Sequence, residues 1–486
     1  MGLMNGSEYI GSLHELHPQV FMFGMKVDNW WEHPILRPSI NNTALTYNLA
    51  FTPEMQDSMT AISTGTGNRI HRFNQLYMSQ ENLMVKSKLL RLLGCRTAAS
   101  SSRSSGMDAL NAVFSSTYAC DKANGGNYYA NFLKYLTYVQ ERDLAVCGAS
   151  EDPAGLYTTS GIETGSLGER LRVVETRPDG IVVQGVKLCP NGALGSHEYL
   201  VLPAVRSSSD VTEAVCFSCP SDVPGLILVY GRRPNDTRNL EQNADVDLGN
   251  RAFGEQQAML IFDRVFIPFE RIFLNGETGF ANEYARRYAE YRAHSYALEK
   301  AGIGDALIGA VSIAAEYSGE SNSPSFQNGL AKMIEKNETL YNMGLACISS
   351  AEADLCGNPR IQPTQAALCN AYALRIPHKL AHLALSFFGK SLLYIPSKTD
   401  VLSETKVPTP SEKTLHEWME TLVPSTGSPA QNRIRILRFI ENICLGSVSV
   451  GFLTDSAQEG DSLRTIYEKL HQEVNQTIVK TLAGVE

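Results

Sequence analysis

The segment Glu290–Lys300 gathers the side chains of this sequence that are best suited to chemistry. It reads Glu-Tyr-Arg-Ala-His-Ser-Tyr-Ala-Leu-Glu-Lys and consists mostly of good helix formers, without proline or glycine. On a helix, Arg292, Tyr296 and Glu299 share one face, because they follow one another at four and then three residues. An apolar run follows at residues 301–315, so the helix is expected to pass through a core. A cation, a phenol and a carboxylate are costly to bury there without a purpose.

Two interpretations of this helix are open from the residues alone. One is a catalytic or binding site, in which His294 is the natural proton shuttle near neutral pH. The other is a salt-bridged helix edge, with Arg292 paired to Glu299 or Glu290 paired to His294. A lone histidine on a helix is more often structural or exposed than catalytic.

The length and charge of the chain narrow the class of protein. Its 486 residues are too many for one simple core and predict two or three domains. The net charge of −9 and the absence of lysine- and arginine-rich runs argue against nucleic-acid binding. No apolar run reaches the roughly 20 residues of a membrane span. Residues 1–8 lack the basic and apolar parts of a secretory signal, so a cytoplasmic protein without membrane contact is expected.

The ten cysteines lack the regular spacing of a disulfide framework and are expected to be reduced thiols. Cys216 and Cys219 form the one Cys-x-x-Cys motif, in a strand-like context and without a second pair nearby. A zinc or redox site there is the less favoured alternative.

Residues 1–145 are predicted to form an N-terminal helical domain. Helical periodicity runs through Gln80–Gly94, Met107–Tyr118 and Tyr128–Asp143. Between the first two of these, residues 96–105 are rich in serine, which is compatible with a flexible linker. Because apolar helical patterns flank this segment closely, a structured surface of small residues is favoured, which a backbone or a flat ligand can approach.

Residues 146–277 change to a period of two residues broken by turns, which predicts strands. The predicted strands are Leu171–Thr176, Gly180–Lys187, Tyr199–Pro203, Gly225–Tyr230 and Ala258–Pro268. Pro178-Asp-Gly is the expected hairpin turn between the first two strands. Together these segments predict a small β-barrel or sandwich domain.

Residues 278–486 return to helical periodicity and predict a C-terminal helical bundle. The helices are expected near 283–318, 325–352, 364–394, 411–423, 429–452 and 460–483, with proline and glycine between them. A β-domain between two helical domains creates a deep cleft, and large cofactors favour such domain junctions.

Several longer strings carry a resemblance to a known family. They are Arg37–Asn41, Arg91–Gly94, Gly106–Phe114, Ala258–Pro268 and Arg438–Gly446. With these strings the chain resembles the family of 4-hydroxyphenylacetate 3-monooxygenase and 4-hydroxybutyryl-CoA dehydratase, nearly end to end and closer to the dehydratase branch. The resemblance implies an α+β, acyl-CoA-dehydrogenase-like architecture with FAD between the β-domain and the helical domains. It also implies a homotetramer or homodimer.

The resemblance places the flavin contacts on two parts of this chain. The first is the loop 150–157, in which the contact residues are Ser150, Asp152, Gly155, Leu156 and Tyr157. The second is Asn191, where the family has a threonine and where a side-chain hydrogen bond is still possible. A third region, residues 454–462, is less rich in glycine than in the relatives.

Departures from the dehydratase branch decide which chemistry is expected. That branch holds an iron–sulfur cluster with three cysteines and one histidine, and the matching positions here are Ser100, Ser104, Arg292 and Glu299. Serine is a poor ligand for such a metal site, and arginine does not ligate at neutral pH, so no cluster is expected. The four side chains would instead bind a polar substrate that faces the flavin.

The catalytic residues of both branches are changed as well. The catalytic glutamate of the dehydratase is Gln257 here and its second carboxylate is Asp455, whereas its catalytic tyrosine is retained as Tyr296. In the monooxygenase branch an arginine, a tyrosine and a histidine bind the phenolate. Their positions here are near Ser105, near Ala109 and at Gly148, with Arg103 close by as a substitute.

Three functional hypotheses follow. The first is a FAD-dependent monooxygenase acting on an aromatic or other small organic substrate, with Arg292, Tyr296 and His294 orienting it and a separate flavin reductase as one source of electrons. The second is a redox-neutral isomerase, lyase or cyclase that uses Tyr296 as acid and base with support from Asp455. The third is a relative without catalysis.

Overall fold

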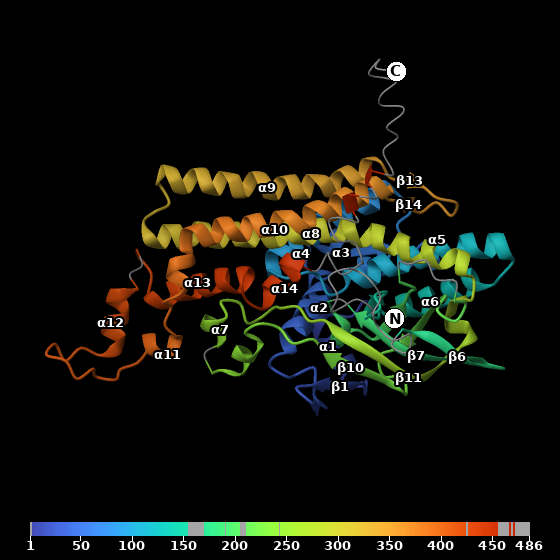
Figure 1. Cartoon of the computed structure of the whole chain (residues 1–486), viewed down its shortest axis with the longest axis horizontal. Helices are drawn as coiled ribbons and strands as arrows, with labels where there is room; N and C mark the ends of the chain where they lie inside the picture. Colours follow the sequence, from blue (N-terminus) through green and yellow to red (C-terminus); the bar gives the residue numbers. More distant parts are fainter. Residues whose placement is uncertain are drawn as a thin grey trace, which may run out of the picture.

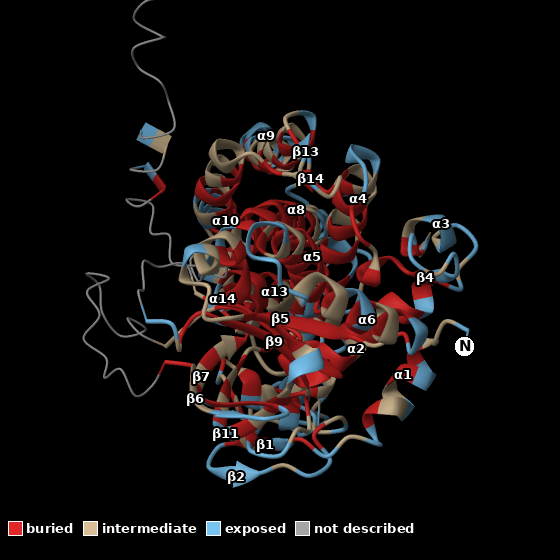
Figure 2. Ribbon diagram, turned by 90° about the vertical axis from the view of Figure 1, so that its right-hand side faces the viewer, coloured by how far each residue is buried: buried red, intermediate tan, exposed pale blue. Residues whose placement is uncertain are grey.

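The computed structural model describes residues 2–153, 170–189, 191–204, 210–242, 244–423, 426–454, 466–467 and 470–471. In this part of the chain a layer of long helices lies against a layer of β-sheet (Figure 1). The ribbon of α8 and α5 is largely buried at the centre of the helical layer (Figure 2). The mixed helix and sheet content agrees with the predicted α+β class.

The β-layer contains two larger sheets. In the six-stranded sheet the order is β2 (Met25–Lys26), β1 (Gln19–Met22), β10 (Leu226–Tyr230), β11 (Ala258–Pro268), β7 (Gly180–Cys189) and β6 (Arg172–Arg177). In the four-stranded sheet the order is β12 (Ile272–Asn275), β9 (Val215–Pro220), β8 (Glu198–Val201) and β5 (Val146–Ala149). Two short ribbons pair β3 (Thr60–Ile62) with β4 (Arg69–His71) and β13 (Glu352–Ala353) with β14 (Pro359–Arg360).

Of the two predicted arrangements, barrel or sandwich, the barrel is wrong, because each described sheet keeps two free edges. Phe217 of β9 and Phe262 of β11 meet edge to face between them, with ring centroids 5.8 Å apart. The predicted hairpin between β6 and β7 is confirmed by the pairing of Arg177 with Gly180. Cys216 and Cys219 lie in separate hydrophobic cores, because an offset of three along a strand places side chains on opposite faces.

The helices of the N-terminal part precede or cover the sheets. They are α1 (Gly6–Leu13), α2 (Arg37–Leu49), α3 (Gln56–Met59), α4 (Gln80–Thr97), α5 (Ser104–Asn124) and α6 (Tyr128–Glu141), and a short α7 (Ala244–Asp247) follows β10. The three longest helices predicted there are confirmed.

The C-terminal part is helical, as predicted. It contains α8 (Thr278–Ser318), α9 (Pro324–Ser349), α10 (Pro363–Leu392), α11 (Lys398–Val401), α12 (Leu415–Leu422), α13 (Ala430–Cys444) and α14 (Ser447–Thr454). Most of the helix expected at 460–483 lies outside the described residues. Within the described chain no single helix combines the length and hydropathy of a membrane span, and only α13 and α14 together, bent by 42°, meet that test.

Helix α8 is the central element of the helical layer, since α4, α5, α9, α10 and α13 all pack on it. Its crossing with α4 is very close at two glycines. A Cβ atom on Gly302 would lie 2.1 Å from the carbonyl oxygen of Arg91, and one on Gly94 would lie 2.5 Å from that of Glu299. The backbones therefore touch where α8 carries its polar residues.

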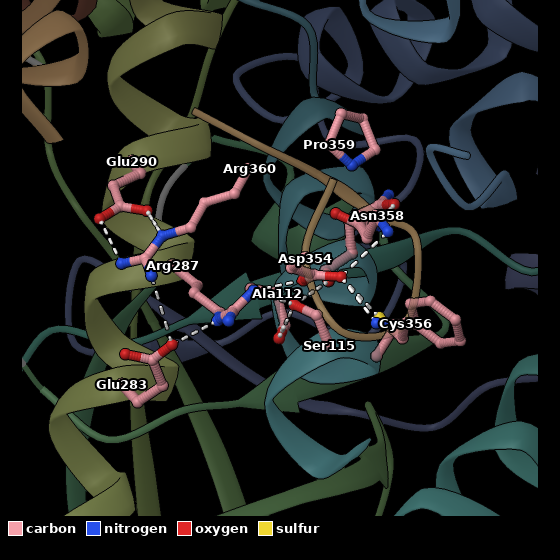
Figure 3. Close-up of polar contacts among 12 residues, drawn as sticks. Ala112, Ser115, Glu283, Arg287, Glu290, Asp354, Cys356, Asn358, Pro359 and Arg360 are labelled. Carbon is pink, nitrogen blue, oxygen red and sulfur yellow. Dashed lines mark hydrogen bonds and ion pairs between the residues drawn. The ribbon is translucent and has the colours of Figure 1, made fainter. Parts of the chain in front are cut away.

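The connection between α9 and α10 fixes the N-terminal half of α8 (Figure 3). Arg287 of α8 pairs with Asp354 at 2.5 Å, and Glu290 pairs with Arg360 at 3.2 Å. Burial opposes ionisation of Asp354, but a hydrogen bond from Cys356 and the charge of Arg287 lower its pKa. Glu290 thus has a partner other than the His294 considered from the sequence.

His197 directly precedes β8 and makes the free energy of unfolding depend on pH. Its Nδ1 accepts the Ala145 N–H at 2.9 Å and its Nε2 lies 2.8 Å from the Ser12 hydroxyl, so the ring is held in its neutral form. Burial, and then the charge of Arg103, lower the pKa of His197 to about 4. Since the unfolded chain gains a proton near pH 6.5 and the folded chain does not, the free energy of unfolding should fall by up to about 3 kcal/mol between pH 6.5 and 4.

Urea titrations at pH 7 and pH 5 measure this dependence. The variant His197→Gln should lose much of it, whereas the exposed His17→Gln should keep the wild-type dependence. An unchanged dependence in His197→Gln would contradict the assignment.

Candidate active site

The serine-rich segment before α5 is structured and buried. Helix α4 ends at Thr97, Ala98 turns the chain in the left-handed region (φ 50°), and Ser100–Ser105 are each about 1–2% exposed. Neighbouring backbones approach it closely, since a Cβ on Gly192 would lie 2.1 Å from the carbonyl oxygen of Ser102. The prediction of a structured segment of small residues, and not a linker, is therefore confirmed.

Arg292 occupies the centre of the predicted site. Its guanidinium lies over the ring of Tyr296, 4.2 Å from the centroid, and donates to the hydroxyl of Ser104 at 3.0 Å. A guanidinium over an aromatic face is attracted by the ring, and more strongly when water is excluded. Arg292 and Tyr296 are each 2% exposed. The structure thus brings together three of the residues that the sequence singled out.

Asp108 of α5 is the counter-ion of this site, and sequence reasoning missed it. It accepts from Arg292 at 3.3 Å, from Lys86 of α4 at 2.7 Å and from the hydroxyl of Ser295 at 2.6 Å. All four side chains are buried. Burial lowers the pKa of Lys86, and the contact with Asp108 opposes this. The sequence signal that could have revealed Asp108 is the presence of a lysine and an aspartate within helical patterns that are otherwise apolar.

Glu299 and Glu255 hold the backbone of the serine-rich segment. Glu299 accepts the N–H of Ser101 at 3.2 Å, and Glu255 accepts the N–H of Ser100 at 2.5 Å. Glu255 also lies 3.5 Å from Arg233. Among the described residues no group of three or more histidine, cysteine, aspartate or glutamate side chains is placed to hold a metal ion.

Gln257 shares Arg233 with Glu255, and its side-chain oxygen accepts a hydrogen bond from this arginine. The hydroxyl of Ser100, in contrast, has no hydrogen-bond partner among the described atoms. Arg233 and Glu255 link these two predicted substrate contacts to each other.

Arg103 lies in a different buried cluster from Arg292. Its guanidinium sits between the rings of Tyr47 and Phe73, at 4.2 and 5.0 Å, and none of its three nitrogens has a hydrogen-bond partner in the described chain. Nearby, His71 pairs with Asp143 at 2.6 Å. The structure therefore does not place Arg103 among the groups around Tyr296.

His294 points toward α4 and α9. Its Nε2 lies 3.5 Å from the hydroxyl of Ser87, and a Cβ on Gly344 would lie 3.9 Å from its ring. Burial, followed by the charge of Lys86, lowers the pKa of His294 well below its usual value. A proton shuttle near neutral pH needs a pKa close to 7, so these surroundings give His294 a neutral, packed ring.

The predicted flavin contacts are described in part. Asp152 pairs with Lys187 at 2.8 Å, and the same lysine donates to the carbonyl oxygen of Ser150 at 2.8 Å. Asn191 bridges the carbonyl oxygen of Ser100 at 2.6 Å and the N–H of Gln256 at 3.0 Å. Gly155, Leu156, Tyr157 and Asp455 lie outside the described residues.

Several buried polar atoms in this region suit a flat, polar ligand. The hydroxyls of Ser100, Ser101 and Ser102 and both ends of the Gln256 amide have no hydrogen-bond partner within the described chain. Buried polar groups are nearly always satisfied. A flavin ring carries both donors and acceptors at its edge, so the residues present fit this group.

A hollow leads toward this region from the outside. Its outer part, of about 620 Å³, is lined by Arg96, Tyr317, Arg435 and Phe439 among others, and it shares Asn250 and Phe253 with a small inner part of about 30 Å³. The inner part is lined by Arg233 and Glu255, among other residues. The inner part thus lies beside Glu255, the carboxylate that holds the backbone of Ser100.

Comparison with known proteins defines the class. The N-terminal model of the 4-hydroxyphenylacetate 3-hydroxylase family matches residues 5–274, and the C-terminal model matches residues 281–468. The chain therefore belongs to the 4-hydroxyphenylacetate 3-hydroxylase family, as its resemblance predicted. The relatives are enzymes, and so is this protein.

Two dehydratases are similar to the whole chain. The 4-hydroxybutyryl-CoA dehydratase/vinylacetyl-CoA-Δ-isomerase of Clostridium aminobutyricum is 40% identical over 100% of both chains. The structure of an oxygen-tolerant 4-hydroxybutyryl-CoA dehydratase from N. maritimus superposes with a TM-score of 0.92 at 32% identity, covering 100% of this chain and 96% of that one.

An oxygenase shares the fold. The oxygenase component of a 4-hydroxyphenylacetate 3-monooxygenase, in complex with FAD, superposes with a TM-score of 0.82 at 20% identity. The superposition covers 99% of this chain and 98% of that one. FAD is thus a cofactor found in the family, in agreement with the prediction from the sequence.

Proposed function

We propose that this protein is a FAD-dependent monooxygenase that acts on an aromatic or other small organic substrate. The observation that carries the proposal is that serine, arginine and glutamate stand at the metal-binding positions of the dehydratase branch, and that one of these residues, Arg292, belongs to a buried ionic cluster. Arg292 lies 3.3 Å from Asp108, which lies 2.7 Å from Lys86, and all three side chains are at most 2% exposed. Such a cluster binds an oxygen-bearing substrate through N–H groups and offers no soft ligand to iron.

The protein's own residues bind the flavin, orient the substrate and exclude water from the site. The unpartnered hydroxyls of Ser100, Ser101 and Ser102 and the amide of Gln256 hold the flavin, together with the loop 150–157. Arg292, held by Ser104 and Asp108, directs its charge toward the substrate. When bound and reduced, FAD supplies the activation of oxygen and the transfer of one oxygen atom. The relative named as an oxygenase component supports a separate flavin reductase as the source of electrons.

A redox-neutral isomerase, lyase or cyclase reaction is the second candidate. The contact of Arg292 with Tyr296 favours it, because a guanidinium over the ring stabilises a developing phenolate. The 40% identity to a dehydratase and isomerase points the same way. In this reaction Tyr296 is the acid and base, and Asp455 supports it.

Isotope labelling separates the two candidates. The FAD-loaded protein, reduced by a flavin reductase, is incubated under ¹⁸O₂ with a panel of phenols and of acyl-CoA thioesters. We expect one ¹⁸O atom in the product, with activity retained in part by Tyr296→Phe and lost in Arg292→Met. Turnover without oxygen, abolished by Tyr296→Phe, would instead establish the redox-neutral reaction.

The proposal includes the organisation of the chain and its assembly. We divide it into an N-terminal helical domain (1–145), a β-domain (146–277) and a helical bundle (278–486), in a cytoplasmic homotetramer or homodimer. Light scattering after size exclusion would reveal a monomer if the assembly is wrong.

A further inference from the structure

Two cysteines meet behind the serine-rich segment. Cys147 on β5 and Cys189 on β7 have their Sγ atoms 3.3 Å apart, and they are 0% and 2% exposed. β5 belongs to the four-stranded sheet and β7 to the six-stranded sheet, so the contact joins the two sheets. The Sγ of Cys147 also lies 3.8 Å from the carbonyl oxygen of Asn191. None of the functions above uses this pair.

The surroundings of the two thiols differ. The hydroxyl of Ser105 lies 3.2 Å from the Sγ of Cys147. The hydrogen bond from Cys189, followed by that from Ser105 and the charge of Arg292, lowers the pKa of Cys147 despite its burial. Burial and the neighbouring thiol raise the pKa of Cys189. Cys147 therefore has the lower pKa of the two, which assigns it the role of the attacking thiol.

The described chain contains a second thiol contact. The Sγ atoms of Cys347 on α9 and Cys369 on α10 are 3.1 Å apart. Cys369 lies 3.3 Å from the carbonyl oxygen of Met343, and the hydrogen bond with Cys347 and burial raise its pKa well above the usual value. The two pairs therefore differ in their surroundings, since a hydroxyl lies beside Cys147 and a carbonyl oxygen lies beside Cys369.

We propose that Cys147 and Cys189 form a redox-active thiol pair that reacts with a peroxide. The Cys147 thiolate attacks a peroxide oxygen, the O–O bond breaks, and Cys147 becomes a sulfenic acid. The Cys189 thiol then attacks that sulfur, a disulfide forms and water leaves. In sum, two thiols and one hydrogen peroxide give one disulfide and two waters, and an external dithiol reverses the reaction.

The disulfide would tie the two sheets together beside the candidate active site. Cys147 contacts Ser105, the second residue of α5, and Asn191, which holds the backbone of Ser100. The pair therefore lies one contact away from the groups proposed to bind flavin. Its oxidation does not depend on the proposed function, because the peroxide is supplied from outside.

Peptide mapping of the native full-length protein tests the pair directly. After treatment with a small molar excess of hydrogen peroxide and quenching with iodoacetamide, trypsin releases Cys147 in residues 143–170 and Cys189 in residues 188–206, without another cysteine in either. We expect these two peptides to appear linked, and the count of free thiols under denaturing conditions to fall from ten to eight. The link should form before any between Cys347 and Cys369.

Two variants test the order of attack. In Cys189→Ser the reaction should stop at a sulfenic acid on Cys147, which dimedone labels, whereas Cys147→Ser should show no label on Cys189. The proposal is overturned if the native wild-type protein forms no link between the two peptides, if the link forms only after unfolding, or if Cys347 and Cys369 link first.

Discussion

Replacing Asp108 by asparagine is expected to lower the free energy of unfolding by about 3–5 kcal/mol, the usual effect of removing one partner from a buried ion pair. Asparagine keeps the shape of the side chain but takes away the carboxylate that Lys86 and Arg292 contact in a site closed to water. Urea unfolding at pH 7, followed by circular dichroism, measures the change.

Two control variants show whether charge is the cause. In Asp108→Asn combined with Lys86→Met, one of the two buried cations is gone, and part of the lost stability should return. Glu175, on the surface, contacts Arg177 at 2.8 Å and is 38% exposed at its side chain. Glu175→Gln should therefore cost much less stability than Asp108→Asn, because exposed ion pairs contribute little. If Asp108→Asn costs no more than Glu175→Gln, the buried cluster does not hold α4, α5 and α8 together.

Replacing Gly302 by alanine is expected to destabilise the protein by about 1–3 kcal/mol, because the added methyl group has no space. Its Cβ would lie 2.1 Å from the carbonyl oxygen of Arg91 and 2.8 Å from the backbone nitrogen of Cys95. Neither atom belongs to a flexible side chain, so α4 and α8 must move apart. Thermal unfolding compared with the wild type measures the effect.

Gly309 on the same helix provides the matched control. No atom lies within 4 Å of a Cβ built there, and the residue is exposed. Alanine is the better helix former by about 0.5–1 kcal/mol, so Gly309→Ala should stabilise the protein. The two substitutions are thus expected to have opposite signs. A stabilised Gly302→Ala variant would show that the helices do not touch as described.

The long helices were predictable because their periodicity is local. Segments near 283–318 and 364–394 appear as α8 and α10 within a few residues of the expected ends. β1 at Gln19–Met22 was missed, since four residues give too short a pattern and its partner β10 is distant in sequence. Whether a sheet closes into a barrel depends on whether its two edge strands pair, and local sequence patterns do not determine this.

The candidate site was predictable only where one helix or the resemblance supplies the residues. The spacing of Arg292 and Tyr296 predicted that they share one helix face, and the resemblance brought in Ser104. Asp108 and Glu255 were missed, because their roles depend on partners on other elements, Lys86 and the backbone of Ser100. Helical periodicity shows that a position faces inward, but it does not identify the residue of opposite charge that lies next to it in the fold.

The pairing of β1 with β10 has a consequence for how the chain reaches its native state. β1 runs parallel to β10 in the register Gln19 with Ile227, Val20 with Leu228 and Phe21 with Val229. During synthesis β1 and the short β2 beside it emerge long before β10, so the other edge of β1 has no partner until residues 226–230 are made. Contacts of such long sequence separation slow folding and prolong the exposure of aggregation-prone segments. Completion of the six-stranded sheet is therefore a late event, and a fragment ending before residue 226 would leave β1 paired with the two-residue strand β2 alone.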